Sequence, residues 1–142
     1  MELVLLSREE IVSNWVYLQN QFQRALSHGQ GESTAVDYLQ KLLNYQAQAW
    51  VIKDNSVFTG AVLTEILNYT RHKTLHIIVF SGEGFENQHR MFLTLENFAR
   101  DNNCSALEAW GRSGWSKVLP KYIPEMREVY RVFRKDLQRQ GE

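Results

Sequence analysis

TLHIIVF SGEGFEN QHRMFLTLENFARD, residues 74–101, is the stretch that decides the fold. Residues 75–80 within it place apolar side chains on both faces of an extended chain, which predicts a strand over 74–81 that is covered by helices on both sides. The glycines and polar residues at 82–87 predict a loop. The remainder predicts a helix over 88–101, because apolar residues recur there at helical spacing: Met91, Leu95, Phe98 and Ala99. A strand, loop and helix in this order predict an α/β domain.

Two further strands are predicted upstream of this stretch, at 47–53 and 57–68. The turn signal Asp54-Asn55-Ser56 separates them, and the polar turn at 71–73 leads into the strand at 74–81. Consecutive strands joined by short polar turns predict an antiparallel meander.

The N-terminal third predicts one short strand and two helices. The apolar run at 3–6 reads as a strand, and capping-box spacing that begins at Ser7 predicts a helix over 8–27. The apolar stripe of that helix is expected to be core rather than a binding face: Ile11, Trp15, Leu18, Phe22 and Leu26. Ser33 is expected to cap a second helix, roughly 34–45.

The C-terminal part predicts a short strand at 106–110, a short helix near 115–119, and a last strand at 129–133, where apolar side chains alternate. The predicted order is therefore β-α-α-β-β-β-α-β-α-β in a single domain, 1–142. Helices that cross between strands make part of the sheet parallel, and the meander makes part antiparallel. The fold class is α/β, in the form of an α+β mixed sheet with helices on both faces.

Composition excludes several function classes. Lys plus Arg and Asp plus Glu number 16 each, so the chain lacks the cationic surplus that non-specific nucleic-acid binding requires. Nothing approaches the ~20 apolar residues of a membrane span. The single cysteine, Cys104, rules out a disulfide within the chain and is expected to be a small buried hydrophobe, with a nucleophile as the alternative. The four histidines show no ligand spacing, so no metal is expected.

The element order resembles that of the GNAT family, the acetyl-CoA-dependent N-acetyltransferases. Residues of the last three-fifths of the chain are similar to small GNAT-like proteins encoded by bacteriophages. The segments that carry the resemblance are VFTGAV (57–62), LENFAR (95–100), Cys104, WGRSGW (110–115) and VFRKDL (132–137). The resemblance implies acetyl-CoA as cofactor, with its pyrophosphate held by the loop and helix after the fourth strand, 74–81.

The resemblance also implies a set of cofactor-binding residues. These are Val79, Ser81, Gly82, Gly84, Phe85, Asn87 and Gln88. The family signature in the loop is Gln or Arg, two residues, Gly, one residue, and Gly or Ala. This chain has its glycines in another spacing and adds Glu83 and Glu86, whose carboxylates repel a pyrophosphate unless they turn away. The loop therefore departs from the family, as does the C-terminal end, where the usual hairpin is shortened.

Acetyl transfer to an amine needs a base, a backbone N–H for the thioester carbonyl and an acid for the leaving thiolate. Glu65 and Glu108, on the third and fifth strands, are the candidate bases, with solvent-facing side chains as the alternative interpretation. Tyr122 is the candidate acid by resemblance of position, with a core-edge aromatic as the alternative. The carbonyl-binding N–H is expected near Val79 to Ser81. His76 is expected to be a core histidine whose polar atoms are satisfied.

The resemblance, together with these patterns, implies three alternative functions. The first is a degenerate acetyltransferase of a phage, with a virion-associated or assembly role, located in the virion or the host cytoplasm. Its partners would be other virion or host proteins, or copies of itself, since a net charge of zero gives weak self-repulsion. The second is an active N-acetyltransferase that acts on a protein or a small-molecule amine. The third is a binding domain that uses the cleft between the fourth and fifth strands, which the family's fold splays apart.

Overall fold

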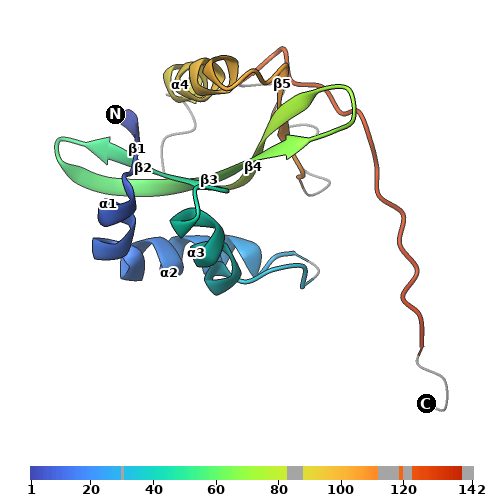
Figure 1. Ribbon diagram of the computed structural model, residues 1–142, viewed down its shortest axis with the longest axis horizontal. Helices are drawn as coiled ribbons and strands as arrows, with labels where there is room; N and C mark the ends of the chain where they lie inside the picture. The colour runs from blue at the N-terminus through green and yellow to red at the C-terminus, as the bar shows by residue number, and fades with distance from the viewer. Residues whose placement is uncertain (30, 83–87, 112–118, 120–122, 139–142) are drawn as a thin grey trace. The chain divides into compact units, whose positions relative to one another are not determined.

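A computed structural model of the protein describes residues 1–29, 31–82, 88–111, 119 and 123–138 (Figure 1). The chain divides into two compact units, Met1–Trp110 and Gly111–Glu142. The first unit contains every strand of the described residues and all four of the helices.

The sheet of the first unit has five strands in the order β1-β2-β3-β4-β5. They are β1 (Glu2–Leu5), β2 (Gln48–Asp54), β3 (Val57–Asn68), β4 (Lys73–Gly82) and β5 (Ala106–Ala109). The first four pair antiparallel, and β5 pairs parallel to β4. The predicted mixed sheet and its meander are confirmed.

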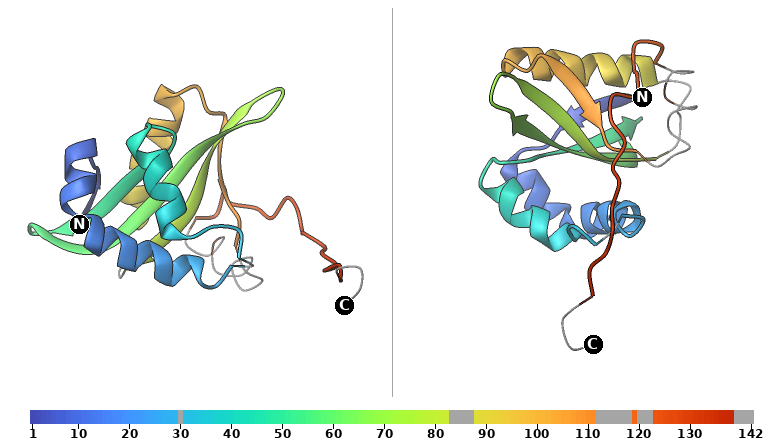
Figure 2. Two further views of the ribbon diagram at one scale, coloured as in Figure 1. Left: turned by 60° about the horizontal axis from the view of Figure 1, so that its bottom comes forward. Right: turned by 90° about the vertical axis from the view of Figure 1, so that its right-hand side faces the viewer.

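Helices cover both faces of this sheet (Figures 1 and 2). They are α1 (Arg8–Ser13), α2 (Trp15–Leu26), α3 (Ala35–Leu43) and α4 (Gln88–Asp101). The first three lie on one face and α4 on the other. Strand β4 is an inner strand with α2 against one side, as its two apolar faces predicted.

The single helix predicted over 8–27 is wrong, because Asn14 divides it into α1 and α2. Asn14 has φ −111° and ψ 17°, and its side-chain Nδ2 donates to the Glu10 carbonyl at 2.9 Å. An asparagine side chain that bonds the backbone of the preceding turn competes with the helical ladder. The capping box at Ser7 and Glu10 is confirmed. At α3 the cap is Thr34 rather than Ser33, because Asp37 completes a capping box with Thr34.

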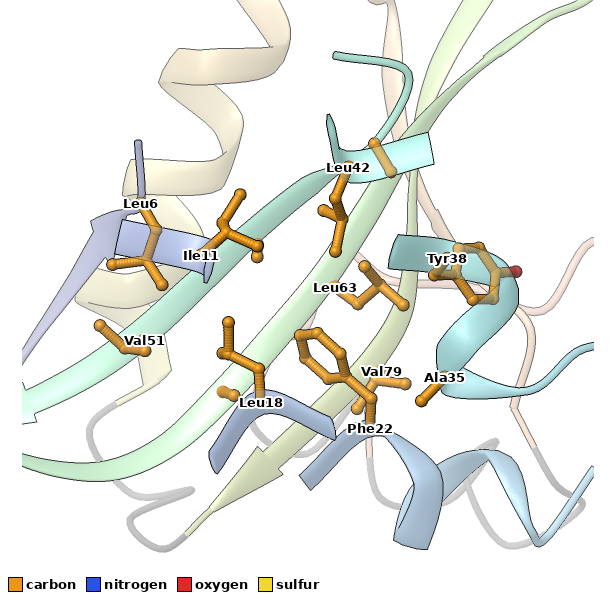
Figure 3. Packing of buried hydrophobic residues seen from close by; sticks show 13 residues of the cluster. Leu6, Ile11, Leu18, Phe22, Ala35, Tyr38, Leu42, Val51, Leu63 and Val79 are labelled. Carbon is orange, nitrogen blue, oxygen red and sulfur yellow. The ribbon is translucent and has the colours of Figure 1, made fainter. Parts of the chain in front are cut away.

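The main hydrophobic core lies between α1–α3 and the sheet (Figure 3). Leu18 and Phe22 of α2 are fully buried there, and Leu63 of β3 and Val79 of β4 face them. Ile11 is buried as well, so the predicted stripe of the N-terminal helices is core. Val79 therefore marks the side of β4 that faces this core.

The opposite face of the sheet packs against α4 through aromatic rings. Trp50 of β2 meets Phe98 of α4 edge to face at 5.2 Å between ring centroids. Trp50 Nε1 donates to Thr64 Oγ1 at 3.0 Å, and Thr64 Oγ1 donates to Gln48 Oε1 at 2.8 Å. This chain of hydrogen bonds satisfies a buried hydroxyl and a buried indole N–H. Cys104, which follows α4, is buried as predicted, and burial raises the pKa of its thiol.

Two glycines let β3 and β4 approach closely where β4 ends. Gly60 and Gly82 are paired in register, and Gly82 has a φ of +136°. A Cβ on Gly60 would meet the Ser81 carbonyl oxygen and stand 2.8 Å from the Gly82 Cα. Because those are backbone atoms, no side-chain rotation can relieve the contact.

The second unit departs from the predicted element order. Residues 129–138 form no strand, and the alternating side chains Val129, Tyr130, Val132 and Phe133 are 55% to 92% exposed. The prediction of a last strand at 129–133 is therefore wrong for this structure. Alternation alone does not make a strand, because the backbone groups must also find a partner along an edge. The predicted helix near 115–119 lies, apart from 119, outside the described residues.

Candidate functional site

A row of three ionisable side chains crosses the sheet. Glu65 of β3 pairs in register with His76 of β4, and His76 pairs in register with Glu108 of β5. Residues directly opposite one another on neighbouring strands point to the same face of the sheet. Lys41 of α3 contacts Glu65, so this is the face that α3 covers.

A β-bulge in β4 is what brings His76 to this face. Leu63 pairs with Val79, but the next residue, Thr64, pairs with Ile77, so Ile78 is an extra residue. Val79 faces the core under α2, and simple alternation would turn His76, three residues earlier, to the α4 face. The extra residue reverses that alternation. Bulges that re-aim a side chain are common beside active sites.

Glu65 is held in a half-buried position rather than pointing into solvent. Its side chain is 15% exposed, and its Oε2 lies 3.2 Å from Lys41 Nζ. Its other oxygen, Oε1, lies 3.8 Å from His76 Nδ1. The solvent-facing interpretation is therefore wrong for Glu65, and both of its oxygens face a nitrogen.

His76 is buried but not satisfied. It is 6% exposed, and its Nδ1 has no hydrogen-bond partner, since 3.8 Å to Glu65 Oε1 exceeds hydrogen-bonding distance. The expectation of a satisfied core histidine is wrong. Burial lowers the pKa of His76, while the carboxylates of Glu65 and Glu108 oppose that shift. Burial is the larger effect, so the imidazole is neutral at neutral pH.

Glu108 and Trp110 complete the row at β5. The Tyr69 hydroxyl donates to Glu108 Oε2 at 2.9 Å, and the Trp110 ring lies 4.3 Å from the His76 ring. Trp110 is 73% exposed, so it presents an aromatic surface next to the row. Sequence reasoning named the two glutamates but missed Tyr69 as their neighbour and His76 as their centre. The sequence does show a histidine within an apolar strand, but only the register of the sheet places it between Glu65 and Glu108.

The cofactor-binding residues predicted on β4 have side chains that are already engaged. Val79 packs in the core, and the Ser81 hydroxyl donates to Gln21 Oε1 at 2.8 Å. Both residues also pair in register with β3, at Leu63 and Ala61. Pairing between β4 and β5 ends at Ile77 and Ala109, while β4 continues to Gly82. The predicted splaying of the two strands requires their pairing to end in this way.

The glycine at 82 has a structural reason to be there. A Cβ on Gly82 would stand 2.8 Å from the Gly60 Cα and 2.8 Å from the Thr59 carbonyl oxygen. Gln88 is the first residue of α4, where backbone N–H groups without helical partners favour an anion. The other predicted site residues, Gly84, Phe85, Asn87 and Tyr122, lie outside the described residues, as do the carboxylates at 83 and 86.

Two kinds of feature are absent from the described part of the chain. No group of three or more His, Cys, Asp or Glu side chains there is arranged to hold a metal ion. None of its helices is both long enough and apolar enough to cross a lipid bilayer.

Comparisons with known proteins give similarity of structure rather than of sequence. No protein-family model matches the chain, and no curated protein sequence matches it significantly. An aminoglycoside acetyltransferase from an uncultured soil metagenomic sample, solved with sisomicin, is 14% identical, with a TM-score of 0.67 over 96% of this chain and 95% of that one. A probable acetyltransferase is 11% identical, with a TM-score of 0.68 over 100% of both chains.

A third solved structure with this architecture is the ribosomal-protein-alanine N-acetyltransferase from Brucella melitensis biovar Abortus 2308. It is 15% identical, with a TM-score of 0.63 over 95% of this chain and 100% of that chain. The fold is therefore that of the GNAT acetyltransferases, as the element order predicted. At these identities the likeness concerns the fold alone.

Proposed function

We propose that this protein binds acetyl-CoA and transfers the acetyl group to an amine. The observation that carries the proposal is the row of Glu65, His76 and Glu108, next to the point where β4 and β5 stop pairing. Half-buried ionisable groups cost free energy unless paired, and they gather at functional sites. A fold without chemistry to perform would gain stability from apolar residues at these positions.

The described residues fit the cofactor that this fold implies. Acetyl-CoA, when bound, supplies the acetyl group as a thioester. Strand β4 continues beyond Ile77, where its pairing with β5 ends, so the edge of β4 between Val79 and Ser81 is not paired with β5 and can receive the thioester. The first turn of α4, beginning at Gln88, offers N–H groups to phosphate oxygens.

The acceptor amine is expected to lie over the row on the α3 side of the sheet. An ammonium group is attracted by the carboxylates of Glu65 and Glu108, and the exposed face of Trp110 favours a cation. A base in the row then accepts the proton that the amine must lose. Tyr122 remains the predicted acid for the leaving thiolate.

Calorimetry with acetyl-CoA, followed by release of free CoA in the presence of simple amines, tests the proposal. We expect micromolar binding by the wild type, lost when Gly84 is replaced by leucine, because the loop must approach the pyrophosphate closely. Glu108→Gln should keep that binding and slow acetyl transfer. No binding at millimolar acetyl-CoA would refute the proposal.

A second candidate is the virion-associated or assembly role of a degenerate acetyltransferase of phage type, in the virion or the host cytoplasm. It is favoured by the apolar side chains of the second unit, since Val132 and Phe133 are 92% and 91% exposed. Exposed apolar side chains close together are typical of interaction surfaces. The test is light scattering of the wild type and of the double variant Val132→Ser, Phe133→Ser. Self-association that the variant abolishes, without acetyl-CoA binding, would favour this role, and a monomeric wild type would count against self-assembly.

A further inference from the structure

We propose that His76 is the base of the acetyl transfer and that Glu65 is the positioning residue that orients its ring. This inference rests on the proposed function and assigns the proton-accepting step within that site. Its starting point is the buried Nδ1 of His76, which has no hydrogen-bond partner and faces Glu65 Oε1 at 3.8 Å.

Glu65 is poorly placed to take the proton itself. Its Oε2 is paired with Lys41 Nζ at 3.2 Å, and its Oε1 faces the imidazole. A carboxylate next to the Nδ1 of a histidine recurs in catalytic sites as the group that orients the ring. Lys41, from α3, fixes this carboxylate from behind.

The orientation determines which nitrogen of His76 is free to accept a proton. With Nδ1–H directed at Glu65, the lone pair of the neutral ring is on Nε2. The bound ammonium first releases one proton to solvent, which leaves a neutral amine whose electron pair forms the new N–C bond. Nε2 accepts the second proton of that nitrogen, and the C–S electron pair leaves with the thiolate. The acid of the site protonates the thiolate, and the imidazolium returns its proton to that acid through solvent, so the protons balance.

The surroundings of His76 suit both of its charge states. Burial lowers the pKa of His76, which keeps the ring neutral and able to accept a proton at neutral pH. Once protonated, the ring lies between two carboxylates, Glu65 on β3 and Glu108 on β5, and next to the Trp110 ring. Lys41 of α3 lies 3.2 Å from Glu65 Oε2, and the Tyr69 hydroxyl donates to Glu108 Oε2, so both groups engage the carboxylates that flank the ring.

The test compares His76→Gln with His28→Gln, an exposed histidine just beyond α2, in kcat, acetyl-CoA affinity and pH profile. We expect His76→Gln to lower kcat by about 10²- to 10⁴-fold, with acetyl-CoA affinity unchanged within about threefold, because the ring does not hold the cofactor. The acidic limb of the kcat profile, which lies below pH ~6.5 in the wild type, should disappear. His28→Gln should behave as the wild type.

Glu65→Gln separates positioning from a merely structural role. Since Glu65 raises the pKa of His76, its replacement should move the acidic limb to lower pH as well as lower kcat. Nitrogen-15 NMR of the imidazole should show the Nδ1–H tautomer in the wild type and a loss of that preference in Glu65→Gln.

Two results would overturn the inference and are distinguishable. If His76→Gln keeps kcat within about threefold of the wild type, His76 is not the base, and the proposed function still stands. A large loss of kcat in Glu108→Gln would then identify Glu108 of β5 as the base. A wild-type protein that neither binds acetyl-CoA nor releases CoA removes the proposed function and the base with it.

Discussion

Replacing Gly60 by alanine tests the close approach of β3 and β4 on which the end of β4 depends. The added Cβ would meet the Ser81 carbonyl oxygen and stand 2.8 Å from the Gly82 Cα and 3.0 Å from Ile52 Cδ1. The isoleucine can rotate, but the two atoms of β4 are backbone in a paired strand. One of the strands must therefore move away from the other.

The expected cost follows from two opposing effects. Overpacking costs about 1–3 kcal/mol, and a contact with backbone that cannot relax lies at or above the top of that range. Alanine in place of a strand glycine returns about 0.5–1 kcal/mol through lower chain entropy. The net loss in the free energy of unfolding is therefore about 2–2.5 kcal/mol or more, a large share of the ~5–15 kcal/mol typical of a domain. It corresponds to a fall in Tm of roughly 10 °C.

Urea denaturation followed by circular dichroism, together with a thermal scan, measures this loss. The matched control is Gly29→Ala, whose Cβ would lie 3.0 Å from Glu32 Oε2, the end of a flexible side chain, and 3.3 Å from the Leu26 carbonyl oxygen. The control should lose less than about 1 kcal/mol. A Gly60→Ala variant as stable as this control would refute the close approach of the two strands.

Three further predictions concern stability. Trp50→Phe should lower the free energy of unfolding by about 1–3 kcal/mol, because it removes the 3.0 Å hydrogen bond from Nε1 to Thr64 Oγ1. A double-mutant cycle with Thr64→Val should give a coupling energy of about 0.5–1.5 kcal/mol. Losses that simply add would contradict this hydrogen bond. Since burial lowers the pKa of His76 below its unfolded value, the unfolded chain binds more protons between the two pKa values, and stability should fall as the pH drops below ~6.5. Chemical denaturation across pH 4.5–8 should show this fall in the wild type and a flatter curve in His76→Gln; equal slopes would count against it. The double variant Val132→Ser, Phe133→Ser should change the free energy of unfolding by less than about 0.5 kcal/mol, because these side chains are 92% and 91% exposed. A loss above about 1.5 kcal/mol would mean that they pack as the predicted last strand.

The sequence by itself was enough to predict most of the elements and their order. Strand β3 and helix α4 have the predicted bounds, 57–68 and 88–101, and the other strands differ by one residue at each end at most. These elements are encoded locally, by apolar periodicity, capping residues and turn residues, which act over a few neighbours in the chain. The mixed sheet then followed from the order of strands and helices.

Features that depend on a competition between local and distant contacts could not be predicted in this way. Asn14 interrupts a helix whose apolar stripe continues through it, because its side chain bonds the backbone instead. The segment 129–133 has the alternation of a strand but no strand partner within the described residues. Alternation in the sequence indicates which side chains could share one face of a strand. It does not indicate whether a sheet edge is available for that strand to pair with.

The candidate site shows the same division most clearly. The sequence indicated Glu65 and Glu108 as reactive carboxylates, because they lie among apolar neighbours in predicted strands. Only the tertiary structure put His76 between them, since the extra residue at Ile78 turns the histidine to the α3 face. The physical reason is that periodicity fixes the facing of a side chain only within one regular strand. Register and bulges are set by pairing between strands far apart in the chain, and they decide which side chains meet.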